Sequence, residues 1–404
     1  MQSVPLRLKK DQERRLLAGH AWVYSNEVDT AATPLADLEP GQAVEIIAQR
    51  GRWLGHGYAN PHSLICARLV SRRRSQPISA ALLVQRVRAA LALREQLFEA
   101  PFYRLVHGEG DALPGLVVDR YGDLLAVQIT TAGMDRLQPL VLAALEQVLR
   151  PTHIVLRNDN PVRELEGLAQ GVHWVLGDDP GAITLTEGEL HFAVAPAGGQ
   201  KTGWFFDQAD NRRAQHRFGP ARRVLDVCCY LGPWGLGAAA GGAESVTFVD
   251  SADGALAGVT ANAEHNGLAA RIDTLHGDAF EVLRALRDDG ARFDRVILDP
   301  PAFIKRRKDE REGTRAYERL NRLGLALLEP GGLLITSSCS FHLSREAFLR
   351  TIQSAARRTE HELQLLLAGA QGPDHPVHPA IPETAYLKTF FLRALPGAQA
   401  NGAD

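Results

Sequence analysis

Apolar and polar residues change their spacing twice along the chain, which predicts three structural regions. In roughly the first 70 residues they alternate over short runs bounded by turn-forming residues, a pattern typical of β-strands. The runs are Ala43–Ile47, Trp53–Ala59 and Leu64–Val70. They predict a small β-barrel, and the polar residues 71–76 predict a linker after it.

The middle of the chain mixes helical and strand periodicity. Residues 80–98 repeat apolar side chains at helical spacing. Short strand-like runs follow, separated by Pro-Gly and Tyr-Gly-Asp turns. A helix over about 134–149 and a strand over 153–156 come next. This mixture predicts a compact α+β domain that ends near residue 185.

From residue 223 onward, strand-like and helical runs alternate. The expected strands are 223–227, 245–249, 272–275, 295–298 and 333–336, and the expected helices include 253–266 and 314–328, with a Pro-Gly-Gly turn at 330–332. Repeated βα units of this length predict a doubly wound parallel sheet, hence an α/β fold. We therefore expect three domains, at residues 1–73, 74–185 and 186–404.

Composition narrows the classes of protein. Hydrophobic residues make up 45% and charged residues 23%, a globular balance. No apolar run approaches the roughly 20 residues of a membrane span, and the first residues lack the apolar core of a signal peptide. These features predict a cytoplasmic protein with no membrane partner.

Charge and cysteine content add two constraints. The four cysteines show no CxxC spacing, so neither a zinc site nor a disulfide framework is indicated, and we expect no metal. The formal net charge is -2, so any nucleic-acid surface must be local. The basic runs Arg72–Arg74 and Lys305–Lys308 are candidates for such a surface.

Two segments at predicted strand ends carry the most specific chemistry. They are Asp299-Pro300-Pro301-Ala302-Phe303 and Ser337-Ser338-Cys339-Ser340. Ligands of open parallel sheets bind beyond the carboxyl ends of the strands, so Asp299 and Cys339 are expected to face one substrate. A thiolate that adds to a pyrimidine ring, with an acid at a ring nitrogen, suits this pair. From spacing alone, an inert buried thiol is an equally good interpretation of Cys339.

Other predicted strands of the sheet also end in acidic residues. Asp226 precedes a glycine turn that contains Gly232, and Asp250 ends the next strand, where it can accept hydrogen bonds from ribose hydroxyls. Asp278 ends the strand after that. The turn lacks GxGxxG, and Asp226 would repel a pyrophosphate. These residues favour S-adenosylmethionine, whose amino group is positively charged.

These motifs together resemble the class I S-adenosylmethionine-dependent methyltransferases that form 5-methylcytosine in 23S ribosomal RNA. The matching segments, in order, are Arg14–Ser25, Gly110–Gly122, Lys201–Arg212, Asp374–Pro376 and Pro382–Lys388. The resemblance implies an N-terminal PUA-like RNA-binding barrel, a central β-α-β domain and a Rossmann-like methyltransferase sheet. It also implies 23S ribosomal RNA as partner, and a homodimer is common in the family.

The resemblance assigns roles to individual residues. Cys339 matches the nucleophile, and Asp299 matches the acid that holds the N3 edge of cytosine beside the cofactor. The other cofactor-binding positions are Gln208, Arg212, Asp226, Gly232, Asp250 and Asp278. Two departures stand out: Pro233 removes an N–H donor from the cofactor loop, and Ala302 replaces the family's lysine. Some enzymes that form 5-methylcytosine carry a second cysteine directly after DPP to assist release, and because this position is Ala302 here, the base that removes the C5 proton is not identified.

Two other functions stay open at this point. A DPP-type acid loop also serves methylation of another base on an exocyclic amine, a reaction that has no use for Cys339. Alternatively, the altered loop at Pro233 allows a ribosomal-RNA-binding assembly factor without catalysis.

Overall fold

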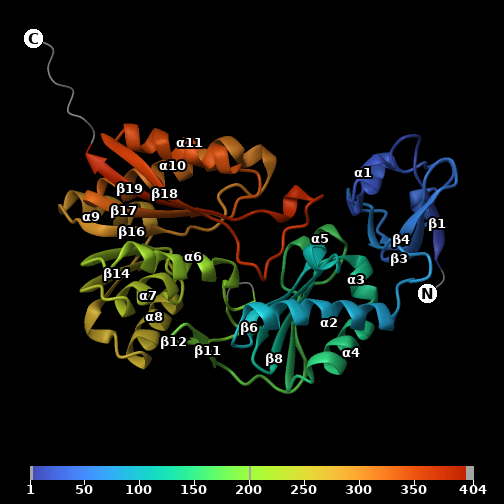
Figure 1. The fold of residues 1–404 in the computed structure, drawn as a ribbon, viewed down its shortest axis with the longest axis horizontal. Coiled ribbons are helices and arrows are strands. Elements are labelled where there is room, and N and C mark those ends of the chain that lie inside the picture. Colours follow the sequence, from blue (N-terminus) through green and yellow to red (C-terminus); the bar gives the residue numbers. More distant parts are fainter. Residues whose placement is uncertain (1–2, 200–201, 397–404) are drawn as a thin grey trace, which may run out of the picture. The chain divides into compact units, whose positions relative to one another are not determined.

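The computed structural model describes residues 3–199 and 202–396 (Figure 1). Lys201, the first residue of one family-like segment, lies outside the described residues. The chain forms two compact units. Unit 1 holds the chain up to Ile183 with Val194–Phe206 and Pro373–Thr384, and unit 2 holds Thr184–Ala193, Asp207–Gly372 and the chain from Ala385. The predicted boundaries after residues 73 and 185 stay predictions.

The first sheet of unit 1 has the order β1-β3-β4-β5-β2. Its strands are β1 (Val4–Arg7), β2 (Trp22–Val23), β3 (Gln42–Ile47), β4 (Trp53–Ala59) and β5 (Ala67–Ser71). The predicted strands at 43–47 and 53–59 are confirmed. The third prediction began too early, because Leu64 lies in a turn and is 70% exposed. Strand β1 escaped prediction because it pairs with β3, far along the chain.

The second sheet of unit 1 has the order β10-β9-β8-β7-β6. Its strands are β6 (Phe102–His107), β7 (Leu116–Tyr121), β8 (Leu124–Ile129), β9 (His153–Arg157) and β10 (Val172–Leu176), and helix α2 (Ala80–Leu97) shares a core with it. The helix predicted over 134–149 is two helices, α3 (Ala132–Arg136) and α4 (Gln138–Leu149). Pro139 lies in the first turn of α4, where it starts a helix well but cannot continue one.

Unit 2 contains a seven-stranded sheet of order β15-β14-β13-β16-β17-β19-β18. The strands are β13 (Arg223–Val227), β14 (Ser245–Asp250), β15 (Ile272–His276), β16 (Phe293–Leu298), β17 (Leu328–Ser338), β18 (His361–Gly369) and β19 (Lys388–Pro396). The five strands from β15 to β17 are parallel, which confirms the predicted α/β fold. Strand β19 was not predicted and runs antiparallel to both neighbours.

Helices cover both faces of this sheet. One layer contains α7 (Pro233–Ala240) and α8 (Asp253–His265), and the other contains α9 (Ala279–Asp288), α10 (Glu310–Ala326) and α11 (Arg345–Arg357) (Figure 1). None of the helices in the described part of the chain is long and apolar enough to cross a membrane.

The Pro-Gly-Gly segment predicted as a turn at 330–332 lies inside β17. It forms an irregularity in the strand, because Phe293 pairs with Leu328 whereas Arg295 pairs with Leu333. Gly331 has a φ of 81°, which only glycine adopts readily. Helix α10 accordingly ends at Ala326, before this segment.

The strand order changes direction at β13. The chain passes from β13 to β14 and β15 on one side, and returns to β16 and β17 on the other. Such a point opens a crevice at the carboxyl ends of the strands, where ligands of this fold bind. The predicted site residues Asp226, Asp250, Asp299 and Cys339 all lie at this edge.

Candidate active site

Asp299 follows β16 in the middle of this edge. Its Oδ1 accepts a hydrogen bond from Gln208 Nε2 at 3.0 Å, and its Oδ2 accepts one from the indole Nε1 of Trp234 at 3.0 Å. Burial raises the pKa of Asp299 to about 6, although both hydrogen bonds act to lower it. A carboxyl group of this kind carries a proton in a fraction of molecules near neutral pH and can serve as an acid.

Asp226 on β13 is completely buried. Its Oδ2 accepts a hydrogen bond from the Gly235 N–H at 2.8 Å, while its Oδ1 has no hydrogen-bond partner within the described ranges. Burial raises the pKa of Asp226 to about 8. A buried carboxylate oxygen without a hydrogen bond lowers the stability of the fold unless a ligand supplies a hydrogen-bond donor. The ammonium group of S-adenosylmethionine would supply one, so Asp226 fits that cofactor.

The loop between β13 and α7 has an unusual backbone. Gly232 has a φ of 81°, and a Cβ atom there would lie 3.1 Å from the Phe248 ring. Cys228 and Tyr230 also adopt left-handed conformations, with φ of 60° and 51°. Strain of this kind collects at ligand-binding loops, and no sequence signal reveals it. Pro233 is the first residue of α7, where its missing N–H costs the helix nothing.

The two remaining acids of the edge have structural partners. Asp250 accepts hydrogen bonds from the N–H groups of Tyr230 and Ala252, each at 3.0 Å, and so holds the loop. Asp278 is exposed and caps α9, because its Oδ1 accepts from the N–H groups of Phe280 at 2.9 Å and Glu281 at 3.2 Å. Their cofactor roles stay predictions.

Gln208 and Arg212 support the acids from the preceding segment. Gln208 is 3% exposed, and its Oε1 accepts a hydrogen bond from Asn211 at 2.7 Å, which orients its amide toward Asp299. Arg212 forms a two-pronged pair with Glu187, at 2.6 and 2.5 Å. Gln208 thus holds Asp299, the charge of Arg212 acts to lower the pKa of Asp299, and a direct contact of either residue with the cofactor stays a prediction.

Cys339 follows β17, the parallel neighbour of β16, so the thiol and the Asp299 carboxylate end adjacent strands. Ser340 ties the two loops together. Its Oγ accepts a hydrogen bond from the Ile304 N–H at 3.1 Å and lies 2.8 Å from the Tyr317 hydroxyl. The structure thus brings the two segments together as the sequence predicted, and their catalytic roles stay predictions.

Three residues of this site were given no role by the sequence. Trp234 bonds Asp299, Ser340 joins the two loops, and Lys388 donates from Nζ to the Ser340 carbonyl at 2.6 Å. The available signals were an aromatic residue in the glycine turn and a lysine at the start of an apolar strand.

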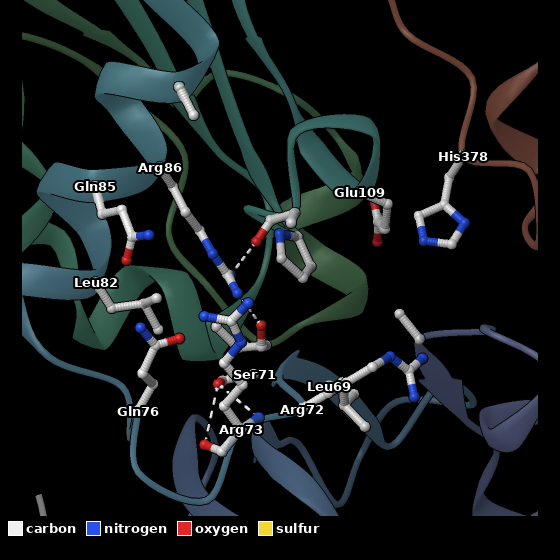
Figure 2. A pocket seen from close by; sticks show the side chains of 15 residues that line it. Leu69, Ser71, Arg72, Arg73, Gln76, Leu82, Gln85, Arg86, Glu109 and His378 are labelled. Atoms are coloured by element: carbon white, nitrogen blue, oxygen red, sulfur yellow. Dashed lines mark hydrogen bonds between the residues drawn. The ribbon is translucent and has the colours of Figure 1, made fainter.

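Unit 1 contains a separate pocket of about 360 Å³ between β5 and α2 (Figure 2). Arg72, Arg73 and Arg86 line it, together with one acid, Glu109. In Figure 2 the side chains of Arg73 and Arg86 extend into the pocket from opposite walls. Glu109 already accepts a hydrogen bond from Trp22 Nε1 at 2.7 Å. The pocket therefore has excess positive charge, which suits an anionic ligand.

Known proteins share this organisation. Residues 6–72 match a family of PUA-like domains, and residues 103–391 match the S-adenosylmethionine-dependent methyltransferases. A solved structure from Streptococcus mutans, assigned to those methyltransferases, superposes with a TM-score of 0.82 at 22% identity and covers 96% of this chain and 100% of that one. A second solved methyltransferase, complexed with SAH, also gives 0.82, covering 97% and 100%. At this identity the likeness concerns the fold.

Curated relatives match over almost their whole length. The protein called ribosomal RNA large subunit methyltransferase I in Erwinia tasmaniensis is 36% identical over 400 residues, covering 97% of this chain and 100% of the relative. The protein of that name in Tolumonas auensis is 35% identical over 403 residues, covering 97% and 100%. S-adenosylmethionine is the cofactor of the family that matches residues 103–391. The chain therefore belongs to the ribosomal RNA large subunit methyltransferase I family of S-adenosylmethionine-dependent methyltransferases.

Proposed function

We propose that the protein methylates C5 of a cytosine in 23S ribosomal RNA through a covalent bond between Cys339 and the base. The observation that carries this proposal is the placement of Asp299 and Cys339 at the ends of adjacent strands, in loops that Ser340 joins. The names of the relatives support ribosomal RNA as the substrate. A homodimer stays a prediction from the family resemblance.

The residues divide the chemistry between them. The Cys339 thiolate forms a bond from Sγ to C6, and the electron pair of the C5–C6 double bond moves to C5. The carboxyl group of Asp299, whose pKa is raised to about 6 by burial, holds N3 and supplies a proton there. Bound S-adenosylmethionine supplies the methyl group that C5 takes. A base then removes the C5 proton, the C5–C6 double bond forms again, the Sγ–C6 bond breaks, and N3 returns its proton to the Asp299 carboxylate.

The proposal also includes an RNA-binding surface outside this crevice. The basic pocket of unit 1 suits the sugar–phosphate backbone, because Arg73 has no partner for its guanidinium within the described ranges. The PUA-like match at residues 6–72 includes Arg72 of the same pocket. The substrate would accordingly be a ribosomal RNA or particle in the cytoplasm.

Methyl transfer from radiolabelled S-adenosylmethionine to unmodified 23S ribosomal RNA, followed by nucleoside analysis, tests the proposal. We expect label in 5-methylcytidine and none with Cys339→Ala. Label in another nucleoside, with Cys339→Ala fully active, would instead establish the amine-methylating alternative. Binding of RNA without any transfer would favour the assembly-factor alternative.

A further inference from the structure

Lys388 has an environment that few lysines occupy. It is only 5% exposed, and its Nζ donates a hydrogen bond to the Ser340 carbonyl at 2.6 Å. Within the described ranges it forms no ion pair with a carboxylate. A buried ammonium group without a negative partner is strongly destabilising. The fold therefore needs a negative charge near Lys388 for the ammonium form to persist.

The position of Lys388 in the sheet points to the source of that charge. Lys388 begins β19 and pairs directly with Ser338, the last residue of β17. Cys339 is the next residue, and the Nζ bond to Ser340 reaches past it. The ammonium group thus lies against the short segment that carries the thiol.

Among the residues that the structure describes, two ionisable side chains affect the pKa of Lys388. Burial lowers the pKa of Lys388 to about 8, the negative charge of Cys339 acts to raise it, and Arg345 acts to lower it. The Tyr317 hydroxyl is a further titratable group at this segment, and burial raises its pKa. Interacting sites titrate together, so a thiolate that favours the ammonium is itself favoured by it.

Burial dominates at the other cysteines, and Arg68, the cation that acts on Cys66, only partly offsets it. Burial raises the pKa of Cys66 to about 12, and it also raises the pKa values of Cys228 and Cys229, which the acids Asp226 and Asp250 raise further. These three thiols stay protonated at neutral pH and react slowly, since only the thiolate is nucleophilic. They provide an internal comparison for any change at Cys339.

We propose that Lys388 is a positioning and activating residue that keeps Cys339 in its thiolate form through the buried contact between β19 and the β17 loop. The ion pair stands independently of any RNA, and its use in catalysis rests on the proposed function. Lys388 transfers no proton to or from the base in this proposal. It lowers the free energy of the thiolate and fixes the Cys339 loop through the Ser340 carbonyl.

Iodoacetamide alkylation of the full-length protein, without RNA or cofactor, tests the pair. Mass spectrometry follows each cysteine separately between about pH 5.5 and 9. In Lys388→Met we expect alkylation of Cys339 at pH 7 to slow by about 10-fold, and its midpoint to move up by about one pH unit. Lys388→Arg retains the charge and should retain most of the reactivity. Arg393→Met, an exposed change on the same strand, should have no effect.

The outcomes separate this inference from the proposed function. Unchanged Cys339 alkylation in Lys388→Met would overturn the ion pair, even if methyl transfer were lost. If circular dichroism shows that Lys388→Met does not fold, Lys388→Arg provides the test. This variant keeps the positive charge, so a shift of the Cys339 alkylation midpoint in it would contradict the inference. If the alkylation results hold but Cys339→Ala still methylates RNA, the ion pair stands and the covalent function fails.

Steady-state kinetics of methyl transfer tests the role of Lys388 in catalysis. In Lys388→Met we expect kcat to fall about 10-fold at pH 7 and to recover partly as the pH rises, because hydroxide then generates the thiolate. The KM for RNA should stay the same. A loss of kcat that is equal at every pH would show that Lys388 acts in another way, and would overturn its role in activation.

Discussion

The thiols at the carboxyl edge of one sheet occupy opposite electrostatic environments. Cys228 and Cys229 follow β13, where burial and the acids Asp226 and Asp250 raise their pKa values. Cys339 follows β17, in the segment whose Ser340 carbonyl accepts a hydrogen bond from Lys388 Nζ. The edge is therefore divided into an acidic half that suits a cationic cofactor and a half that favours a nucleophilic thiolate. Position in the strand order, more than residue type, separates a reactive cysteine from a packing one.

The largest expected effect is a loss of methyl-transfer activity that occurs on substitution of Cys339 and not of Cys228 or Cys229. Cys339→Ala should lower the rate of methyl transfer by at least about 10³-fold, because it removes the nucleophile. Cys228→Ala and Cys229→Ala should each change the rate by less than about fivefold, apart from any loss of stability. Initial rates with radiolabelled S-adenosylmethionine measure all three. Comparable losses in the three variants would remove the distinction between the halves.

The acidic half can be tested through its dependence on pH. Asp226 has its pKa raised by burial from 3.8 to about 8, so the folded protein retains a proton that the unfolded chain loses. This contribution to stability is fully present below the ordinary pKa and is lost as the pH rises toward 8. We expect the unfolding free energy of the cofactor-free protein to fall by about 3–4 kcal/mol between pH 5 and 8. Asp226→Asn should flatten that dependence.

Urea unfolding at several pH values measures this effect. Asp278→Asn is the matched control, because Asp278 is exposed and asparagine caps a helix equally well. Added S-adenosylmethionine should stabilise the wild-type protein more than Asp226→Asn at pH 8. A stability of Asp226→Asn that falls with pH as steeply as that of the wild-type protein would show that Asp226 is not the group responsible.

The sequence predicted much of the arrangement of acids and cysteines at this sheet edge, for a physical reason. Strand ends in a parallel sheet share one edge, so acids at the ends of successive apolar runs predict a cluster without any knowledge of side-chain contacts. Asp226, Asp250, Asp299 and Cys339 were found in this way. The βα alternation likewise predicted the five parallel strands.

What the sequence missed depends on contacts between distant segments. Strand β19 inserts between β17 and β18, and only this insertion places Lys388 beside Cys339. The indole of Trp234 meets Asp299 across 65 positions of the chain. Periodicity describes neighbours in sequence, and it carries no information on such pairings. The strained backbone at Cys228 and Tyr230 is invisible for the same reason, since tertiary structure imposes it.

A smaller effect is expected at Asp299, which lies between the two halves. Trp234→Phe removes the indole donor to Oδ2, and this hydrogen bond acts to lower the pKa of Asp299. The pKa should therefore rise further above 6, and the corresponding limb of the pH–rate profile should move to higher pH. Because Asp299 acts as the acid, we expect kcat/KM at pH 7 to rise by about fivefold, since a pKa about one unit higher increases the proton-bearing fraction from about a tenth to about a half. Trp174→Phe, in unit 1, is the control.

The smallest expected effect concerns RNA binding in unit 1 and separates it from catalysis at the two halves of the sheet edge. Arg73→Gln removes one positive charge from the pocket of unit 1, whereas Arg74→Gln removes one from a side chain that lies over the Trp53 ring and does not line the pocket. We expect Arg73→Gln to weaken RNA binding about threefold and to reduce the salt slope of binding by about one, with kcat unchanged. Filter binding between about 50 and 200 mM salt measures both quantities. Because both arginines follow β5, equal effects of the two variants would assign RNA binding to the general charge of this segment and leave the pocket without a role.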